Sequence, residues 1–225
     1  MVIRVETHRL AYMAVPKAAC TSIKAALAVL DPDQPKSHAD DLGEFEVHGI
    51  YPTMRFRPHR WAMYEDHFRF TVVRDPLKRL LAVYTNRVET LGIPENCRNI
   101  RRGMVHLPKQ PDPDYFFQNL PAYILASSDI KHHSLPTWLF TGRDFSLYDR
   151  VYRTSDLADL ADTLSKRVGM PVDIPHFNSS DRRLQLHDLA PKTQWALEVF
   201  LADQYAHLAD FFDNPFDRPR IHAVA

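Results

Sequence analysis

The sequence has few cysteines, no net charge and no long apolar run, and each shortage excludes a class of protein. Only Cys20 and Cys97 are present, without Cys-x-x-Cys spacing, so we expect neither a disulfide framework nor a zinc site. Basic and acidic residues balance at 28 each, which leaves no overall field to attract nucleic acid. Residues 1–8 are too polar for a signal peptide, and no apolar run is long enough for a membrane span. We therefore expect a cytoplasmic protein whose anion sites, if present, come from local arrangement.

The chain is long enough for one substantial core. Its 225 residues fall in the size range of one domain, which we expect to span residues 1–225. Residues 10–15 and 68–73 are short, apolar and rich in β-branched or aromatic side chains, as buried parallel strands are. Each leads at once into a polar turn and a helical pattern, over residues 22–30 and 76–91. These two units predict an α/β fold, a P-loop-type parallel sheet flanked by helices on both faces.

The rest of the chain gives a weaker structural signal. A third strand is expected to include residues 151–153, and a helix to follow over residues 156–168. The last long helix is expected over residues 193–212, with Trp195 packed inside the protein. Residues 31–60 and 91–114 are expected to be long irregular segments, either surface insertions or functional loops.

The turn after the first strand has the layout of a phosphate-binding loop, yet it contains no glycine. It consists of Pro16, Lys17, Ala18, Ala19, Cys20, Thr21 and Ser22. A Walker A loop needs glycines so that its amides can wrap a triphosphate, whereas N–H groups at a helix start can hold a single phosphate. Lys17 can reach the far side of that group, and both hydroxyls can donate to its oxygens. In the alternative interpretation, Thr21 and Ser22 only cap the helix while Lys17 is solvated.

A second anion-binding candidate, Arg74, stands where the strand of residues 68–73 ends and the next helix begins. Its guanidinium can project over the carboxyl edge of the sheet, where open α/β sheets bind their ligands. A planar fork of five donors suits a phosphate monoester better than a lysine does. Alternatively, Arg74-Asp75-Pro76 is only a helix entry with a salt-bridged cap.

Taken together, the two motifs are much more specific. PKAACTSIKAAL followed by FTVVRDPLKRLLAVY closely resembles the paired signatures of sulfotransferases that use 3′-phosphoadenosine 5′-phosphosulfate (PAPS). The resemblance is greatest to the carbohydrate sulfotransferases, which include the chondroitin 4-O and heparan sulfate 2-O enzymes. Residues 133–136 are similar to a His-x-x-Pro element of that family, and residues 175–179 to its His-x-Asn-x-Ser stretch.

The resemblance implies how the cofactor is bound. The Lys17 turn would grip the 5′-phosphosulfate and Arg74 the 3′-phosphate of PAPS, with adenosine 3′,5′-bisphosphate as the product and no metal ion. The family usually has a serine that contacts the 3′-phosphate where this chain has Ala82. Loss of that hydroxyl costs about 1 kcal/mol unless another residue, such as Arg182 or Arg183, replaces it.

The resemblance also implies a reaction, the transfer of a sulfuryl group to a glycan or other hydroxyl-bearing acceptor. Lys17 would neutralise charge on the leaving oxygens, and a histidine would take the acceptor's proton. Among 12 histidines, His48 is the first candidate, because the heparan sulfate 2-O enzymes carry their catalytic histidine in that interval in a similar His-Gly context. His133 is the second, through the His-x-x-Pro match. Either imidazole could instead have a purely structural role.

Two other functions are compatible with these motifs. One is a small-molecule kinase with an atypical phosphate loop, against which the missing Gly-Lys-Thr pattern counts. The other is a non-catalytic nucleotide-binding relative, suggested mainly by Ala82. Magnesium dependence distinguishes the first from a sulfotransferase, and sulfuryl transfer distinguishes the second.

Overall fold

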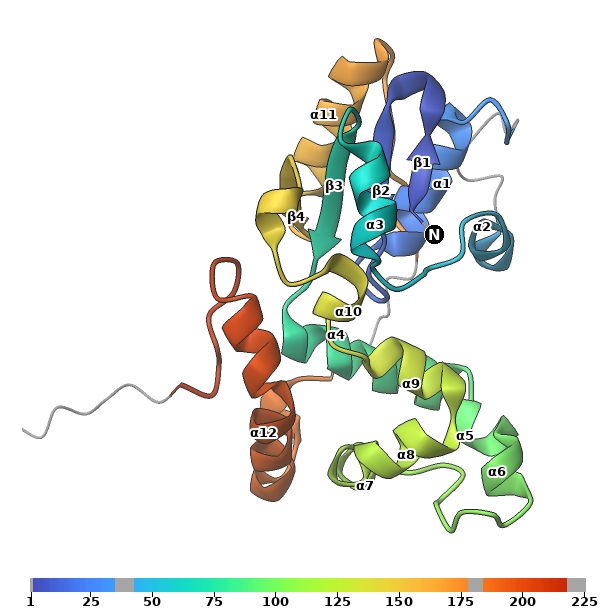
Figure 1. Cartoon of the computed structure of the whole chain (residues 1–225). Helices are drawn as coiled ribbons and strands as arrows, with labels where there is room; N and C mark the ends of the chain where they lie inside the picture. The colour runs from blue at the N-terminus through green and yellow to red at the C-terminus, as the bar shows by residue number, and fades with distance from the viewer. Residues whose placement is uncertain (1, 35–42, 178–183, 218–225) are drawn as a thin grey trace, which may run out of the picture.

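The computed structural model describes residues 2–34, 43–177 and 184–217. Within these residues, four strands form one sheet in the order β1-β2-β3-β4 (Figure 1). The edge strand β1 (Ile3–Val5) runs antiparallel to β2 (Leu10–Met13). Strands β2, β3 (Phe68–Val73) and β4 (Arg150–Arg153) are parallel. With helices around this mostly parallel sheet, the predicted α/β class is confirmed.

The sheet is covered on both faces, as its alternating side chains require. Tyr12 and Phe70 stack on one face, where they belong to a core shared with α1 (Cys20–Leu30) and α11 (Leu157–Val168). Ala11, Met13 and other side chains of the opposite face pack against Trp61 and Tyr64. These two aromatic residues come from α3 (Pro58–Trp61) and the 3-10 helix η3 (Ala62–Tyr64).

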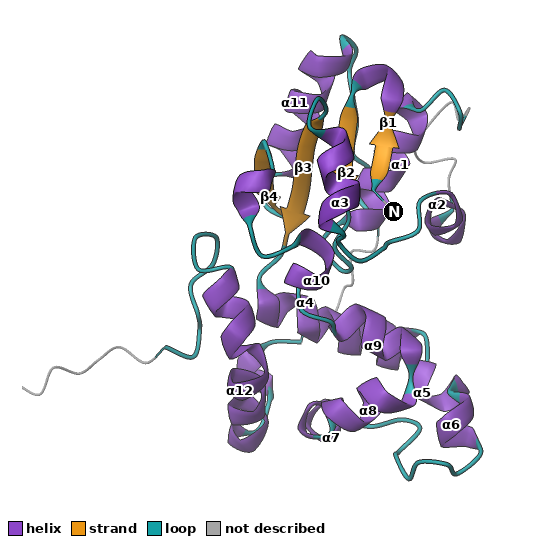
Figure 2. Cartoon of the chain, viewed as in Figure 1, coloured by secondary structure: helices purple, strands orange, loops and turns teal. Residues whose placement is uncertain are grey.

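A second, all-helical layer lies beyond the carboxyl ends of β2 and β3 (Figure 2). Its core includes Leu80, Phe116, Tyr123 and Leu201. It is built from α4 (Pro76–Val83), η4 (Tyr84–Thr90), α5 (Ile93–Asn96), α6 (Arg98–Arg101), α7 (Pro113–Gln118), α8 (Leu120–Ala126), α9 (Ser128–Ser134) and α12 (Pro191–His207). The remaining short helices are η1 (Glu6–His8), α2 (Glu44–Ile50), α10 (Trp138–Thr141), η5 (Phe145–Leu147) and η6 (Leu186–Asp188).

The helix predicted over residues 76–91 changes its hydrogen-bond pattern halfway. After α4 the chain continues as a π-helix, η4, in which Leu91 N donates to Asn86 O, five residues earlier, at 3.0 Å. Thr90 Oγ1 adds a bond to Thr85 O at 2.9 Å. Wider turns of this kind occur frequently at functional sites. The prediction of one regular helix is therefore wrong in its second half.

Three other expectations meet different outcomes. The third strand and the helix after it are confirmed as β4 and α11. The segments expected to be irregular contain α2, α3, α5 and α6, so that expectation is wrong in part. The last helix ends at His207, and its buried stripe is Leu197, Leu201 and Tyr205. Trp195 lies on another face and is 65% exposed, so its predicted packing is wrong.

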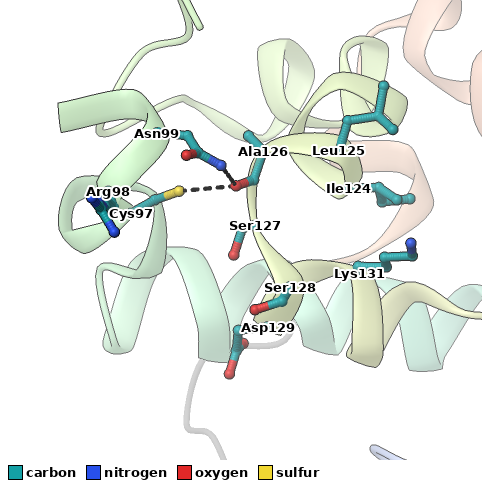
Figure 3. A pocket seen from close by; sticks show the side chains of 10 residues that line it. All are labelled: Cys97, Arg98, Asn99, Ile124, Leu125, Ala126, Ser127, Ser128, Asp129 and Lys131. Carbon is teal, nitrogen blue, oxygen red and sulfur yellow. Dashed lines mark hydrogen bonds between the residues drawn. The ribbon is translucent and has the colours of Figure 1, made fainter. Parts of the chain in front are cut away.

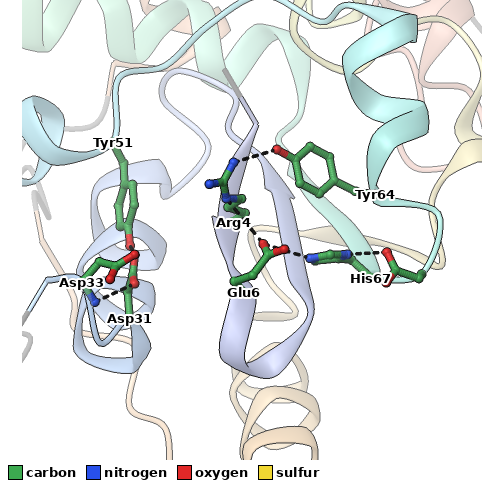
Figure 4. A network of polar contacts seen from close by, with 8 residues as sticks. Arg4, Glu6, Asp31, Asp33, Tyr51, Tyr64 and His67 are labelled. Atoms are coloured by element: carbon green, nitrogen blue, oxygen red, sulfur yellow. Dashed lines mark hydrogen bonds and ion pairs between the residues drawn. The ribbon is translucent and has the colours of Figure 1, made fainter.

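Polar contacts attach the edge strand β1 to the segment before β3 (Figure 4). Arg4 donates to the Tyr64 hydroxyl at 3.3 Å, and its Nε lies 3.4 Å from Glu6. His67 is buried between Glu6 and Asp66, with ring nitrogens 3.4 and 2.8 Å from the two carboxylates. Most of these groups are exposed, so we expect them to fix register more than to add stability.

Arg79 joins three parts of the helical layer. This α4 side chain is fully buried, and burial lowers the pKa of its guanidinium to about 10. Nη1 donates to His133 O at 3.1 Å, and Nη2 donates to Leu135 O at 2.6 Å and to Gln204 Oε1 at 3.0 Å. The arginine thereby ties α4 to the end of α9 and to α12.

We predict that Arg79→Met lowers the free energy of unfolding by about 3 kcal/mol. The variant keeps most of the side-chain volume but leaves three acceptors, His133 O, Leu135 O and Gln204 Oε1, without their charged donor. Urea denaturation measures the change, with Lys78→Met, at an exposed position of the same helix, as the control. Equal unfolding free energies for the two variants would contradict this role.

Candidate active site

The two predicted anion-binding motifs, the Lys17 turn and Arg74, meet at the carboxyl ends of strands β2 and β3. Strands β2 and β3 are parallel neighbours with Met13 opposite Thr71, so the segments that follow them leave side by side. The Thr71 hydroxyl donates to Met13 O at 2.7 Å at this end of the pair. Arg74 Nη1 donates to Lys17 O at 3.0 Å. The guanidinium therefore lies against the backbone of the Lys17 turn, residues 16–22.

Asp75 fixes the chain directly after Arg74. Its carboxylate caps α4 by accepting from Lys78 N at 2.8 Å, and it also accepts from the Tyr205 hydroxyl at 3.1 Å. The same hydroxyl oxygen accepts from Leu77 N at 3.2 Å. The helix-entry interpretation is thus correct for Asp75, but the residue that completes it is a tyrosine of α12.

The Lys17 turn has an unusual backbone. Lys17 and Ala19 have φ angles of 63° and 57°, in the left-handed region that favours glycine. Ala18, between them, is fully buried and packs with Val15 and Phe140. Conformations of this kind persist only where the surroundings enforce them, and they concentrate at ligand sites. The turn therefore adopts, without glycine, two backbone conformations that ordinarily favour glycine.

The two hydroxyls of the turn lie in the first turn of α1. The helix begins at Cys20, its N-cap is Ala19, and no side chain caps it. The interpretation of Thr21 and Ser22 as capping residues is therefore wrong. Thr21 Oγ1 lies 3.2 Å from His48 Nε2, and Ser22 Oγ accepts from Phe177 N at 3.3 Å. The first amides of such a helix have no intrahelical partner and carry the positive end of its dipole.

Lys17 is held by a residue that the sequence did not single out. Its Nζ donates to Oδ1 of Asn86, on the π-helix η4. Asn86 belongs to the stretch expected to be a regular helix, so no local pattern marked it. The contact keeps the ammonium group in the region of the turn.

His48 lies on α2, beside α1, and contacts two α1 residues. Its Nε2 faces Thr21, and its Nδ1 lies 3.0 Å from Nζ of Lys24. Lys24 is fully buried and also donates to Thr53 Oγ1 at 2.6 Å. Sequence reasoning missed Lys24, although a lysine within the apolar run IKAALAVL, three residues after Thr21, was a visible signal.

Electrostatics keep His48 neutral. Burial lowers its pKa to about 4, and the charges of Lys24, Arg87, His133 and Lys17 act in the same direction. Burial also lowers the pKa of Lys24 to about 8. The imidazole is therefore neutral near pH 7 and has a lone pair available, but the same burial and cations reduce its affinity for a proton.

Both ring nitrogens of His133 are engaged by neighbouring groups. Nε2 lies 2.7 Å from Nη2 of Arg87, and Nδ1 lies 2.8 Å from Asp129 O. Because a guanidinium can only donate, Nε2 accepts and Nδ1 carries the proton. His133 is thus near His48 but already committed to hydrogen bonds.

A cavity of about 460 Å³ lies beside this network, between the start of α6 and the α8–α9 junction (Figure 3). Cys97 and Asn99 on one side both donate to Ala126 O, at 3.3 and 2.7 Å. Asp129 lines the cavity, and its carboxylate also lies 3.3 Å from His133 Nδ1. The cavity is therefore separated from His133 by one side chain.

The remaining predictions from the sequence concern Ala82, four residues outside the described ranges, metal binding and membrane spans. Ala82 is half-buried on α4. Asn178 and Ser179 of the His-x-Asn-x-Ser stretch, and Arg182 and Arg183, lie outside the described residues. Among the residues that the structure describes, no group of three or more His, Cys, Asp or Glu side chains is arranged to hold a metal ion. In the same ranges, no helix has the length and apolar character needed to cross a membrane.

Comparison with known proteins identifies one family. A sequence model of the sulfotransferase family matches residues 1–206. A relative, carbohydrate sulfotransferase 14 of Danio rerio, is 26% identical over 178 residues, which cover 74% of this chain and 47% of the relative. The chain thus spans about half the length of that relative. No solved structure gives a significant match. The resemblance to carbohydrate sulfotransferases noted in the sequence is confirmed.

Proposed function

Because this chain belongs to the sulfotransferase family, we propose that it transfers a sulfuryl group from PAPS to a hydroxyl of a carbohydrate or glycoconjugate. The observation that carries the proposal is the contact of Arg74 with the backbone of the Lys17 turn, which joins two anion-binding motifs into one site. The name of the Danio rerio relative supports a carbohydrate acceptor.

The donor groups of the site fit a doubly phosphorylated nucleotide. The first amides of α1, the Lys17 ammonium and the Thr21 and Ser22 hydroxyls would hold the 5′-phosphosulfate. Arg74 would hold the 3′-phosphate, since a guanidinium has five N–H donors and can bind Lys17 O and an anion together. The cations that lower the pKa of His48 add to the positive potential of the same region.

Each catalytic role follows from a position in the site. When bound, PAPS supplies the sulfuryl group and leaves as adenosine 3′,5′-bisphosphate. Lys17 would leave Asn86 and neutralise the charge that develops on the leaving side. His48 would take the proton of the acceptor hydroxyl at Nε2, which faces the uncharged Thr21 hydroxyl, whereas Nε2 of His133 accepts from the Arg87 guanidinium. His133 would instead orient Arg87.

Nucleotide selectivity is the first test of this function. We expect adenosine 3′,5′-bisphosphate to bind at least ~10-fold more tightly than ATP, with no change on adding magnesium or a chelator, because the turn suits one phosphate and not three. Calorimetric titration measures the binding, and transfer of radiolabelled sulfate to a panel of glycans measures the reaction. Magnesium-dependent preference for ATP would indicate a kinase, and selective binding without transfer a non-catalytic relative.

The two cations of the site should have separable effects. We expect Lys17→Ala to reduce kcat about 100-fold or more, because the charge of the leaving group is no longer neutralised. Arg74→Ala should mainly weaken binding of the bisphosphate, by about 10-fold or more for a lost charge-assisted contact. Lys78→Ala, at an exposed position of α4, is the control. Wild-type rates and affinities in both variants would remove the mechanistic basis of the proposal.

Ala82 allows a test by gain of a contact. If the position faces the 3′-phosphate as the family's serine does, Ala82→Ser should tighten binding of the bisphosphate about fivefold, the effect of one hydroxyl donor worth about 1 kcal/mol. Ala122→Ser, on α8, controls for the general effect of a helical serine. An unchanged affinity would mean that position 82 does not reach the phosphate.

A further inference from the structure

The proposed binding of PAPS makes no use of the buried contact between Lys24 and His48. Lys24, fully buried on α1, points its Nζ at His48 Nδ1 at 3.0 Å and at Thr53 Oγ1 at 2.6 Å. The opposite ring nitrogen of His48 faces the Lys17 turn through Thr21. Polar contacts therefore connect Thr53, in the segment after α2, through Lys24 and His48 to Thr21, at the expected sulfuryl site.

The arrangement is held by a second contact between the same two elements. The Tyr51 hydroxyl, at the end of α2, donates to Asp31 Oδ2, at the end of α1 (Figure 4). Val47, one residue before His48, is fully buried in the core that contains α1. His48 is thus fixed on both sides, and its Nδ1 has a defined partner.

Lys24 decides which nitrogen of His48 carries the proton. A charged lysine has three donors and no acceptor, so the charged form of Lys24 requires Nδ1 to accept and places the ring proton on Nε2. In that form Nε2 donates to Thr21 and has no lone pair with which to accept a proton. A neutral Lys24 can accept from Nδ1–H, which leaves the Nε2 lone pair directed toward the turn.

We propose that Lys24 is a positioning residue that switches His48 between a resting form, protonated on Nε2, and a basic form, protonated on Nδ1. The proposal rests on the proposed function, in which His48 is the base. In the basic form, the acceptor O–H bond breaks and its proton moves to Nε2, while the Nδ1 proton moves to Lys24 Nζ. The pair is then in the resting form, which carries one proton more than the basic form. Loss of that proton from Lys24 Nζ through the Thr53 hydroxyl to water restores the basic form.

The surroundings place this switch near neutral pH. Burial lowers the pKa of Lys24 to about 8, with the nearby Cys20 acting in the opposite direction. The other titratable or charged groups that face the pair are Lys17, Arg87, His132 and His133. The basic form therefore becomes dominant as the pH rises through about 8, although the pKa of His48 itself is about 4.

Nitrogen-15 NMR of the labelled protein tests the proposal without any activity, because ring-nitrogen shifts report which nitrogen is protonated. In the wild type we expect His48 to carry its proton on Nε2 at about pH 6 and on Nδ1 above about pH 8. Lys24→Arg, which cannot deprotonate, should keep the proton on Nε2 throughout. Lys24→Met, of similar length and uncharged, should abolish the transition near pH 8.

His133 is the internal control, since its contacts with Arg87 and Asp129 should keep its proton on Nδ1 in all three proteins. The His48 signal is assigned by its loss in His48→Asn. An Nδ1-protonated His48 already at about pH 6 in the wild type, or an unchanged transition in Lys24→Arg, would overturn the proposal. Since Lys24→Met introduces no buried charge, it is expected to fold if the larger arginine does not fit.

The pH dependence of kcat/KM is the second measurement. The wild-type value should rise with pH to a plateau above about 8, and in Lys24→Met the rise should move to lower pH. Lys24→Arg should remain about 100-fold below the wild type at all pH values. Identical pH profiles for the wild type and Lys24→Met would contradict the switch. If no sulfuryl transfer is found, the proposed function fails, and the switch is then decided by the NMR result, which does not depend on activity.

Discussion

The parallel pairing of β2 with β3 is the constraint on which the site depends. Parallel neighbours end at the same edge, so the turn after β2 and the arginine after β3 must emerge side by side. The hydrogen bond from Arg74 to Lys17 O directly links these two segments. A shift of register between these strands would move the two cations apart. The Thr71 bond to Met13 O and the Tyr205 bond to Asp75 hold the two chain segments at this point.

The glycine-free turn shows how packing replaces intrinsic flexibility. Two non-glycine residues with positive φ cost about 1–2 kcal/mol each relative to ordinary backbone. Burial of Val15, Ala18 and Phe140 in a common cluster is of comparable magnitude, since a fully buried large apolar side chain contributes about 1.5–3 kcal/mol. The turn is thereby held in its shape before any ligand arrives. A preorganised anion site does not spend binding energy on reorganisation.

Local sequence patterns predicted the elements whose conformation depends mainly on residues that are neighbours in the sequence. Strands β2, β3 and β4, the two turns and α11 follow from apolar runs, proline placement and hydrophobic period, whereas the antiparallel strand β1 was not predicted. Asn86 and Lys24 could not be assigned roles in this way, because their partners are 69 and 24 residues away in the chain. The π-helix and the exposure of Trp195 depend on how the helical layer packs, so a pattern read along one helix misassigned both. The glycan acceptor and the role of His48 as base stay predictions.

A site of this kind must satisfy two different electrostatic demands. It needs cations to hold an anion, and it needs an uncharged imidazole to take a proton. The cations around His48 serve both demands, since the charges that would attract a phosphate also lower the pKa of the histidine. A bound anion would weaken that second effect and favour protonation of the pair of His48 and Lys24. The buried Lys24, with a pKa of about 8, counteracts this protonation of the pair, because it releases its proton far more readily than an exposed lysine would. The overall neutrality of the chain is compatible with such a site, because Lys17, Lys24 and Arg87 bring positive charge to one region around His48.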